Sequence, residues 1–155
     1  MPSRGDTPGL PAPPPLIFIA GLLVGGVLEA IFPTDSPAWW VRGLVGVVGL
    51  GGAYLLAGRA LRSFATVDTS PNPFEPTTAI ATDGPYRFTR NPMYLGMTLA
   101  YIGLTFAIGI LWALAVLPVV LLIIDRLVIA REERYLEARF GDEYRAYKRR
   151  VRRWL

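Results

Sequence analysis

Two short segments of this sequence contain most of the residues that could bind a small polar molecule. Residues 84–96 read GPYRFTRNPMYLG, and residues 131–147 begin Arg-Glu-Glu and are rich in tyrosine and charge. The 32 residues from 93 to 124 carry no charged side chain. Carboxylates beside such a stretch are costly unless they are solvated or paired, so Glu132 and Glu133 are candidates for function.

The candidate partners of these glutamates are Arg90, Arg126 and Arg131. Each residue of the two segments also has a purely structural interpretation: Gly84-Pro85 as a turn, Asn91-Pro92 as a helix start, Tyr86 and Tyr94 as interfacial aromatics, and Arg90 as a side chain that reaches the lipid headgroups. Propensity alone favours this structural interpretation.

The chain has no cysteine and no histidine. Disulfides, thiol chemistry and an imidazole base are therefore excluded. A zinc site would need carboxylates alone, which is unusual, so we expect no metal site.

Long apolar segments predict an all-α polytopic membrane protein with four transmembrane helices. The first runs over 16–32 and the second from the Trp39-Trp40 pair to about Gly58. The uncharged run is too long for one crossing of a hydrocarbon core of about 30 Å. It predicts a hairpin of the third and fourth helices that turns near 109–112, with a kink or local opening at Pro118.

Small residues recur in the first two predicted helices: Gly21, Gly25, Gly43, Gly46, Gly49 and Gly52. They indicate either close helix packing or only the general abundance of glycine in membrane helices.

Residues 1–15 are rich in proline and glycine and predict a disordered arm. The following apolar run could also belong to a signal peptide, but Glu29 interrupts it. We expect residues 16–155 to form a single membrane-embedded domain.

Basic residues are concentrated towards the carboxyl end, where residues 126–155 hold ten of the sixteen. They follow a membrane segment, so anionic lipid headgroups are nearer partners than nucleic acid. With the arginines of the loop before residue 93, they place both termini and the central loop in the cytoplasm. Apolar residues at 136, 140, 144, 147 and 151 predict an amphipathic C-terminal helix that Gly141 weakens.

The two chemical segments resemble the family of isoprenylcysteine carboxyl methyltransferases and phospholipid methyltransferases. That family has the pattern G-x-Y-x-x-x-R-H-P-x-Y-x-G, a hydrophobic hairpin, and then E-E-x-x-L-x-x-x-F-G-x-E-Y-x-x-Y. This sequence matches it at Gly84, Tyr86, Arg90, Pro92, Tyr94 and Gly96, and at Glu132, Glu133, Leu136, Phe140, Gly141, Glu143, Tyr144 and Tyr147. The resemblance covers about residues 76–153, and two halves in register are far more specific than one short motif.

The resemblance implies methyl transfer from S-adenosylmethionine to a lipidic or small amphiphilic acceptor at the cytoplasmic membrane face. It implies positioning roles for Arg90 and Glu132. The cofactor contacts that it implies are Tyr86, Asn91, Pro92, Met93, Tyr94 and Glu132, with Ala79, Ile80, Ala81, Gly96, Glu133 and Tyr144 as further candidates.

Two positions depart from the family pattern. Asn91 stands where many members have histidine, and it cannot titrate. Val128 stands where carboxyl-methylating members have a substrate-binding arginine, so the resemblance supports the cofactor better than a prenylcysteine substrate. The alternatives are a non-enzymatic membrane protein and a membrane-embedded reductase, although no phosphate-binding glycine-rich fingerprint is present. The acceptor and the oligomeric state are not indicated.

The predicted topology can be tested with reporter fusions. Fusions near Ser36 and Gly109 should report an external location, and a fusion after Leu155 a cytoplasmic one, because basic loops stay inside. A cytoplasmic signal at Gly109 would contradict the hairpin.

Overall fold

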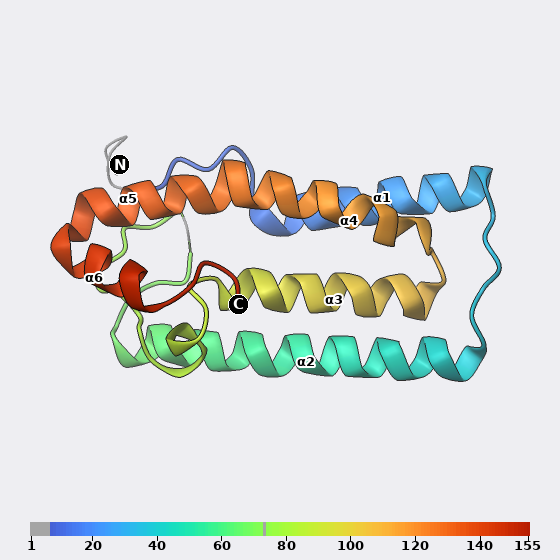
Figure 1. The fold of residues 1–155 in the computed structure, drawn as a ribbon, viewed down its shortest axis with the longest axis horizontal. Helices are drawn as coiled ribbons and strands as arrows, with labels where there is room; N and C mark the ends of the chain where they lie inside the picture. Colours follow the sequence, from blue (N-terminus) through green and yellow to red (C-terminus); the bar gives the residue numbers. More distant parts are fainter. Residues whose placement is uncertain (1–6, 73) are drawn as a thin grey trace. The chain divides into compact units, whose positions relative to one another are not determined.

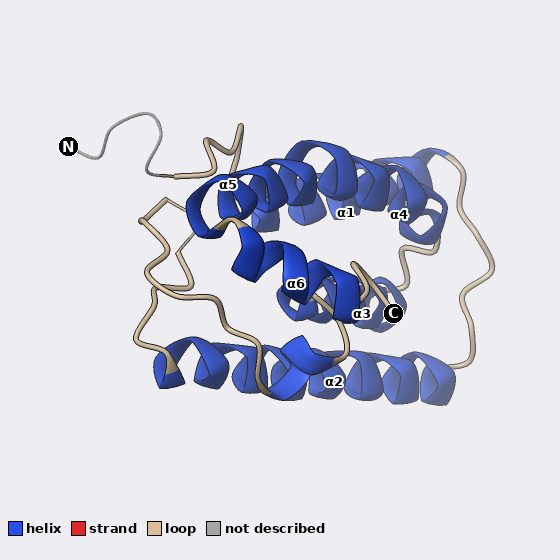
Figure 2. Cartoon of the chain, turned by 60° about the vertical axis from the view of Figure 1, so that its left-hand side comes forward, coloured by secondary structure: helices blue, strands red, loops and turns tan. Residues whose placement is uncertain are grey.

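The computed structural model describes residues 7–72 and 74–155, and within them it contains helices and no strand (Figures 1 and 2). The elements are α1 (Pro14–Ile31), α2 (Trp39–Thr66), the 3-10 turn η1 (Gly84–Arg87), α3 (Pro92–Ile108), α4 (Trp112–Ile123), the π-helical η2 (Ile124–Ile129), α5 (Ala130–Phe140) and α6 (Asp142–Arg150). The all-helical prediction is confirmed. Part of the predicted N-terminal arm, residues 1–6, lies outside the described residues.

Three helices are long and apolar enough to cross a membrane: α1, α2 and the continuous run Trp112–Phe140. The third predicted crossing corresponds to α3, which is apolar but has only 17 residues. Large apolar side chains are exposed along α1 and α2, including Leu23, Val27 and Val47. Such surfaces are costly in water and ordinary in lipid. The chain is therefore an integral membrane protein.

The chain divides into two compact units. Of the described residues, one unit contains 12–55 and 94–124, and the other contains 7–11, 56–72, 74–93 and 125–155. We refer to them as the membrane unit and the site unit.

Glycines allow helices of the membrane unit to approach closely. A Cβ on Gly25 would lie 2.5 Å from the Cα of Ala113 on α4. A Cβ on Gly49 of α2 would lie 2.8 Å from the Cα of Gly103 on α3, and the space beside Gly43 is open. Close packing is therefore the correct interpretation for Gly25 and Gly49, but not for every glycine of the pattern.

Two charged side chains of the membrane unit satisfy helix ends. Arg42 donates to the carbonyls of Phe106, Ala107 and Ile108 at 3.3, 3.0 and 2.9 Å, at the carboxyl end of α3. Glu29 accepts from the backbone N–H of Trp112, the first residue of α4, at 3.3 Å. The last carbonyls and the first N–H groups of a helix have no intrahelical partners. The carbonyl end favours a cation and the N–H end favours an anion, so Arg42 and Glu29 both stabilise the α3–α4 turn. The turn contains Gly109 at φ 88°, where the sequence predicted it.

The helix after this turn continues from Trp112 to Phe140, through α4 and α5 (Figure 1). Its local opening lies at the π-helical η2, whereas Pro118, where a kink or opening is predicted, lies within the α-helical α4. The predicted C-terminal helix is divided at Gly141, whose φ is 54°, so that α5 and α6 are separate helices (Figure 2). A positive φ suits glycine because it has no Cβ.

The glycine contacts generate a stability prediction. Gly49→Ala should lower the melting temperature in detergent, because overpacking a close contact costs about 1–3 kcal/mol. The matched control is Gly51→Ala on the same helix, where nothing lies within 4 Å of an added Cβ. Equal melting temperatures for the two variants would contradict close packing at Gly49.

Candidate active site

The first chemical segment is held in the site unit by a turn and a small core. Gly84 starts η1 with a φ of 59°, and a Cβ there would lie 2.8 Å from Ser63 Oγ. Tyr86 on the same turn is buried with Ala60 and Ala81. Its ring packs edge-on against Phe64, with the ring centroids 5.4 Å apart.

The second segment runs over α5 and α6, and its α5 part supplies a buried carboxylate. Glu133 is buried, and its Oε1 lies 2.8 Å from Arg90 NH2. The predicted pairing of this glutamate with an arginine is confirmed, and Arg90 is the predicted partner that makes it. The other candidates lie elsewhere: Arg126 pairs with Asp125, and Arg131 donates to the carbonyl of Gly9.

A second arginine, which no sequence pattern indicates, also binds Glu133. Arg153 NH2 lies 2.5 Å from Glu133 Oε2, and Arg153 NH1 lies 3.1 Å from both Asp125 oxygens. The adjacent Trp154 donates from Nε1 to Asp125 Oδ1. The sequence predicts that the basic tail faces anionic lipid, whereas for Arg153 the structure shows an ion pair within the chain. Arg153 differs from the other tail arginines only through these contacts with residues distant in the sequence.

The backbone around Arg153 also holds the first segment. Asn91 Nδ2 and Thr89 Oγ1 donate to the Arg153 carbonyl at 2.8 and 3.1 Å. The Arg90 backbone N–H donates to the carbonyl of Arg152 at 2.9 Å. The residues after α6 therefore pair with residues 89–91 through both main chain and side chains.

Three buried tyrosines line the same unit. Tyr147 donates its hydroxyl to the carbonyl of Tyr86 at 2.8 Å. Burial is the main cause that raises the pKa of Tyr86, Tyr144 and Tyr147. Their phenols therefore stay neutral at physiological pH and can donate hydrogen bonds, but they are poor bases.

Glu132 is half-buried on α5. Its negative charge adds to the burial that raises the pKa of Tyr86 and Tyr144. The two chemical segments meet directly at Tyr86 and Tyr147, which are 61 positions apart in the sequence. The site unit thus contains both aromatic faces and a half-buried carboxylate, the groups that suit a cationic ligand.

Arg90 has one unsatisfied donor. Its Nε is buried and has no hydrogen-bond partner among the described residues, although NH1 donates to the Lys148 carbonyl and NH2 pairs with Glu133. An orphaned buried donor is costly and unusual in a native protein. An acceptor on a ligand would satisfy it.

The other predicted residues are distributed between the two units. Asn91 and Pro92 are buried in the site unit, Met93 packs against the Tyr86 cluster, and Ala79 and Ile80 are half-buried there. Tyr94 and Gly96 are buried on α3 in the membrane unit.

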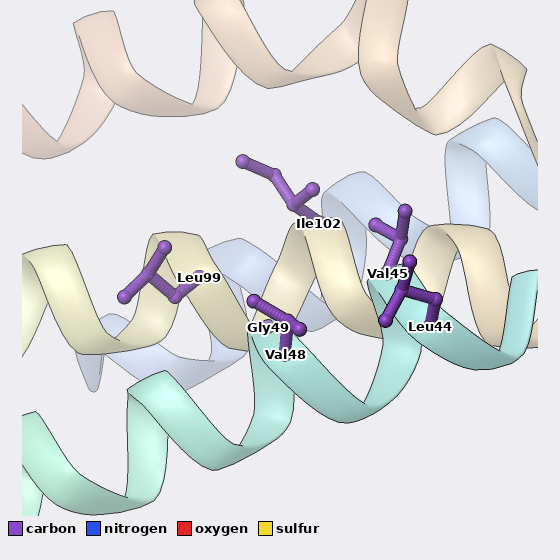
Figure 3. A pocket seen from close by; sticks show the side chains of 6 residues that line it. All are labelled: Leu44, Val45, Val48, Gly49, Leu99 and Ile102. Carbon is purple, nitrogen blue, oxygen red and sulfur yellow. The ribbon is translucent and has the colours of Figure 1, made fainter. Parts of the chain in front are cut away.

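An apolar groove of about 370 Å³ lies in the membrane unit (Figure 3). Its lining comes from α2 and α3 and consists of Leu44, Val45, Val48, Gly49, Leu99 and Ile102. None of the predicted cofactor residues belongs to it. Among the described residues, no group of three or more acidic side chains is placed to hold a metal ion.

Comparison with known proteins agrees with the family resemblance seen in the two chemical segments. A family model described as phospholipid methyltransferase matches residues 41–143. A protein of Haemophilus influenzae (strain ATCC 51907 / DSM 11121 / KW20 / Rd), described as uncharacterized, is 48% identical over 63 residues, which are 41% of this chain and the whole of that protein. No solved structure matches.

Proposed function

This chain belongs to the phospholipid methyltransferase family, and from that membership we propose that it transfers a methyl group from S-adenosylmethionine to a lipidic or small amphiphilic acceptor in the membrane. The observation that supports the site best is the pairing of the two segments, in which the Tyr147 hydroxyl donates to the Tyr86 carbonyl and Arg90 forms a buried ion pair with Glu133. These residues come from the two separate halves of the family pattern.

The residues of the site unit fit the charges of this cofactor. The Glu132 carboxylate and the Tyr86 ring would hold its cationic sulfonium and ammonium groups. The orphaned Arg90 Nε and the amino end of α3, which begins at Pro92, would favour its carboxylate. Met93 and Ala81 supply apolar surface beside Tyr86.

When bound, S-adenosylmethionine supplies an electrophilic methyl group on sulfur. The contribution of the chain is to align the acceptor and exclude water, since proximity and orientation account for most of the acceleration in such a displacement. An amine acceptor must lose a proton first. The tyrosine phenols are poor bases and Asn91 cannot titrate, so a carboxylate or water would accept that proton.

We propose four membrane crossings, with α3 as the third, and a cytoplasmic location for the site unit. A 17-residue helix is about 25 Å long, close to the thickness of a thin hydrocarbon core. Arg42 is engaged by helix carbonyls, and the remaining basic side chains lie before α3 or after α4. The fusions at Ser36 and Gly109 described above test this proposal.

The two glutamates should differ in their roles. Glu132→Gln should weaken binding of S-adenosylmethionine by about 10- to 100-fold, because a charge-assisted contact is worth about 1.5–3 kcal/mol. Its melting temperature should stay near that of the wild type. Glu133→Gln should instead destabilise the protein by about 3 kcal/mol, because it breaks a buried ion pair.

Calorimetry and thermal unfolding in detergent would measure both effects. Wild-type protein that binds neither S-adenosylmethionine nor its demethylated product would reject the proposed function. Normal binding by Glu132→Gln together with lost binding by a folded Glu133→Gln would reverse the assignment of the two residues.

The acceptor should lack a carboxylate. Val128 is fully buried, and Arg126 has a side chain that is 74% exposed and pairs with Asp125. Neither places an unpaired cation in the interior, where a free carboxylate would need one. In a panel with radiolabelled cofactor, we expect phosphatidylethanolamine or apolar amines, phenols or thiols to be methylated better than a prenylcysteine.

Val128→Arg is the complementary variant. It should gain activity on carboxylate acceptors if the geometry of carboxyl-methylating members carries over. Robust turnover of the prenylcysteine alone by the wild type would contradict the expected acceptor class.

A further inference from the structure

Arg153 contacts both halves of the site, one through its side chain and the other through its main chain. No other described residue after α6 makes both kinds of contact. Its guanidinium binds Glu133 through Nε and NH2, and its carbonyl accepts hydrogen bonds from Asn91 and Thr89. Glu133 belongs to the second chemical segment, and Asn91 belongs to the first. Arg153 therefore bridges the two segments, in addition to their direct contacts at Arg90–Glu133 and Tyr86–Tyr147.

Arg153 and three neighbouring charged side chains form a balanced set, apart from the exposed Arg126, which also pairs with Asp125. The guanidiniums of Arg90 and Arg153 both reach Glu133, and Arg153 also reaches Asp125. Two cations thus meet two carboxylates. The side chains of Arg90 and Glu133 are only 10% and 8% exposed, so a missing member would leave an uncompensated buried charge.

The contact pattern requires the shape of an arginine. The planar guanidinium presents Nε and NH2 to one carboxylate and NH1 to the other at the same time. Lysine has a single ammonium group and cannot reproduce this fork. Asp125, which binds the NH1 of Arg153, lies in the wider π-helical segment η2. It precedes Glu133 of α5 by about two helical turns.

We propose that Arg153 is a positioning residue of the cofactor site, held in place by Asp125. It orients Glu133, and through Glu133 the Arg90 guanidinium with its unsatisfied Nε, while its carbonyl fixes the amide of Asn91. This inference rests on the proposed function, because Arg90 is taken there to favour the cofactor's carboxylate, and Asn91 is one of the cofactor contacts that the family resemblance implies. It assigns Arg153 a role in the site rather than at the lipid surface.

The test is the affinity for S-adenosylhomocysteine, measured by calorimetry on the full chain in detergent. Arg153→Met should weaken binding about tenfold, because displaced binding groups lose affinity steeply with small shifts. Arg152→Met is the matched control: it removes the same charge one position away, and its side chain is exposed. The control should bind within about twofold of the wild type.

Further variants separate positioning from a general loss of stability. Arg153→Lys should give an intermediate affinity, and Asp125→Asn should weaken binding in the same direction. Beside its loss of stability, a folded Glu133→Gln should also bind more weakly than the wild type, though less so than Glu132→Gln. Arg153→Met should add little to that loss of affinity, since residues that act through one another are not additive. In turnover assays the KM for the cofactor should rise, and the KM for the acceptor should stay near its wild-type value.

Each outcome bears on the proposal. Wild-type affinity in Arg153→Met, or equal losses in Arg153→Met and Arg152→Met, would overturn it. If Arg153→Met does not fold, unchanged affinity in both Arg153→Lys and Asp125→Asn would overturn it as well. A wild-type protein that fails to bind S-adenosylhomocysteine would instead reject the proposed function and the inference with it.

Discussion

The buried carboxylate of Glu133 is the group on which the arrangement of the site unit depends. An ion in such a position costs several kcal/mol unless partners surround it, and here Arg90 and Arg153 do so. For these two arginines to reach Glu133, the face of α5 that carries Glu133 must point towards residues 89–91. The chain after α6 must also return to residues 89–91. The break at Gly141 permits that return because a positive φ redirects the chain between two helices.

The membrane unit is organised by different physics. Lipid offers no hydrophobic driving force between helices, so close contacts at Gly25 and Gly49 provide dispersion attraction. Polar backbone at the α3–α4 turn cannot be left unpaired near lipid, and Arg42 and Glu29 satisfy it. Charged side chains therefore have different roles in the two units. Arg42 and Glu29 of the membrane unit satisfy backbone groups at helix termini, and the charged residues of the site unit pair with one another in a polar cluster.

This division agrees with membership of the phospholipid methyltransferase family, whose activity is methyl transfer to a lipid in a membrane. In the site unit, charged groups and neutral phenols lie together: Tyr147 donates to the Tyr86 carbonyl, and Arg90 pairs with Glu133 and retains a buried unpaired donor. The apolar groove between α2 and α3 contains none of these residues. The polar cluster and the apolar groove thus belong to different units of the chain.

The amino-acid pattern alone predicts the apolar helices, a hairpin turn near residues 109–112 and the two chemical segments, because apolar length, turn residues and motif spacing are local properties. It also indicates that Glu133 needs an arginine. Which arginines pair with Glu133, and which glycines are close-packed, follows only from contacts in the folded chain. Arg153 is indistinguishable from Arg152 in composition and spacing, and its role arises because the folded chain brings it to Asp125 and Glu133, 28 and 20 residues earlier.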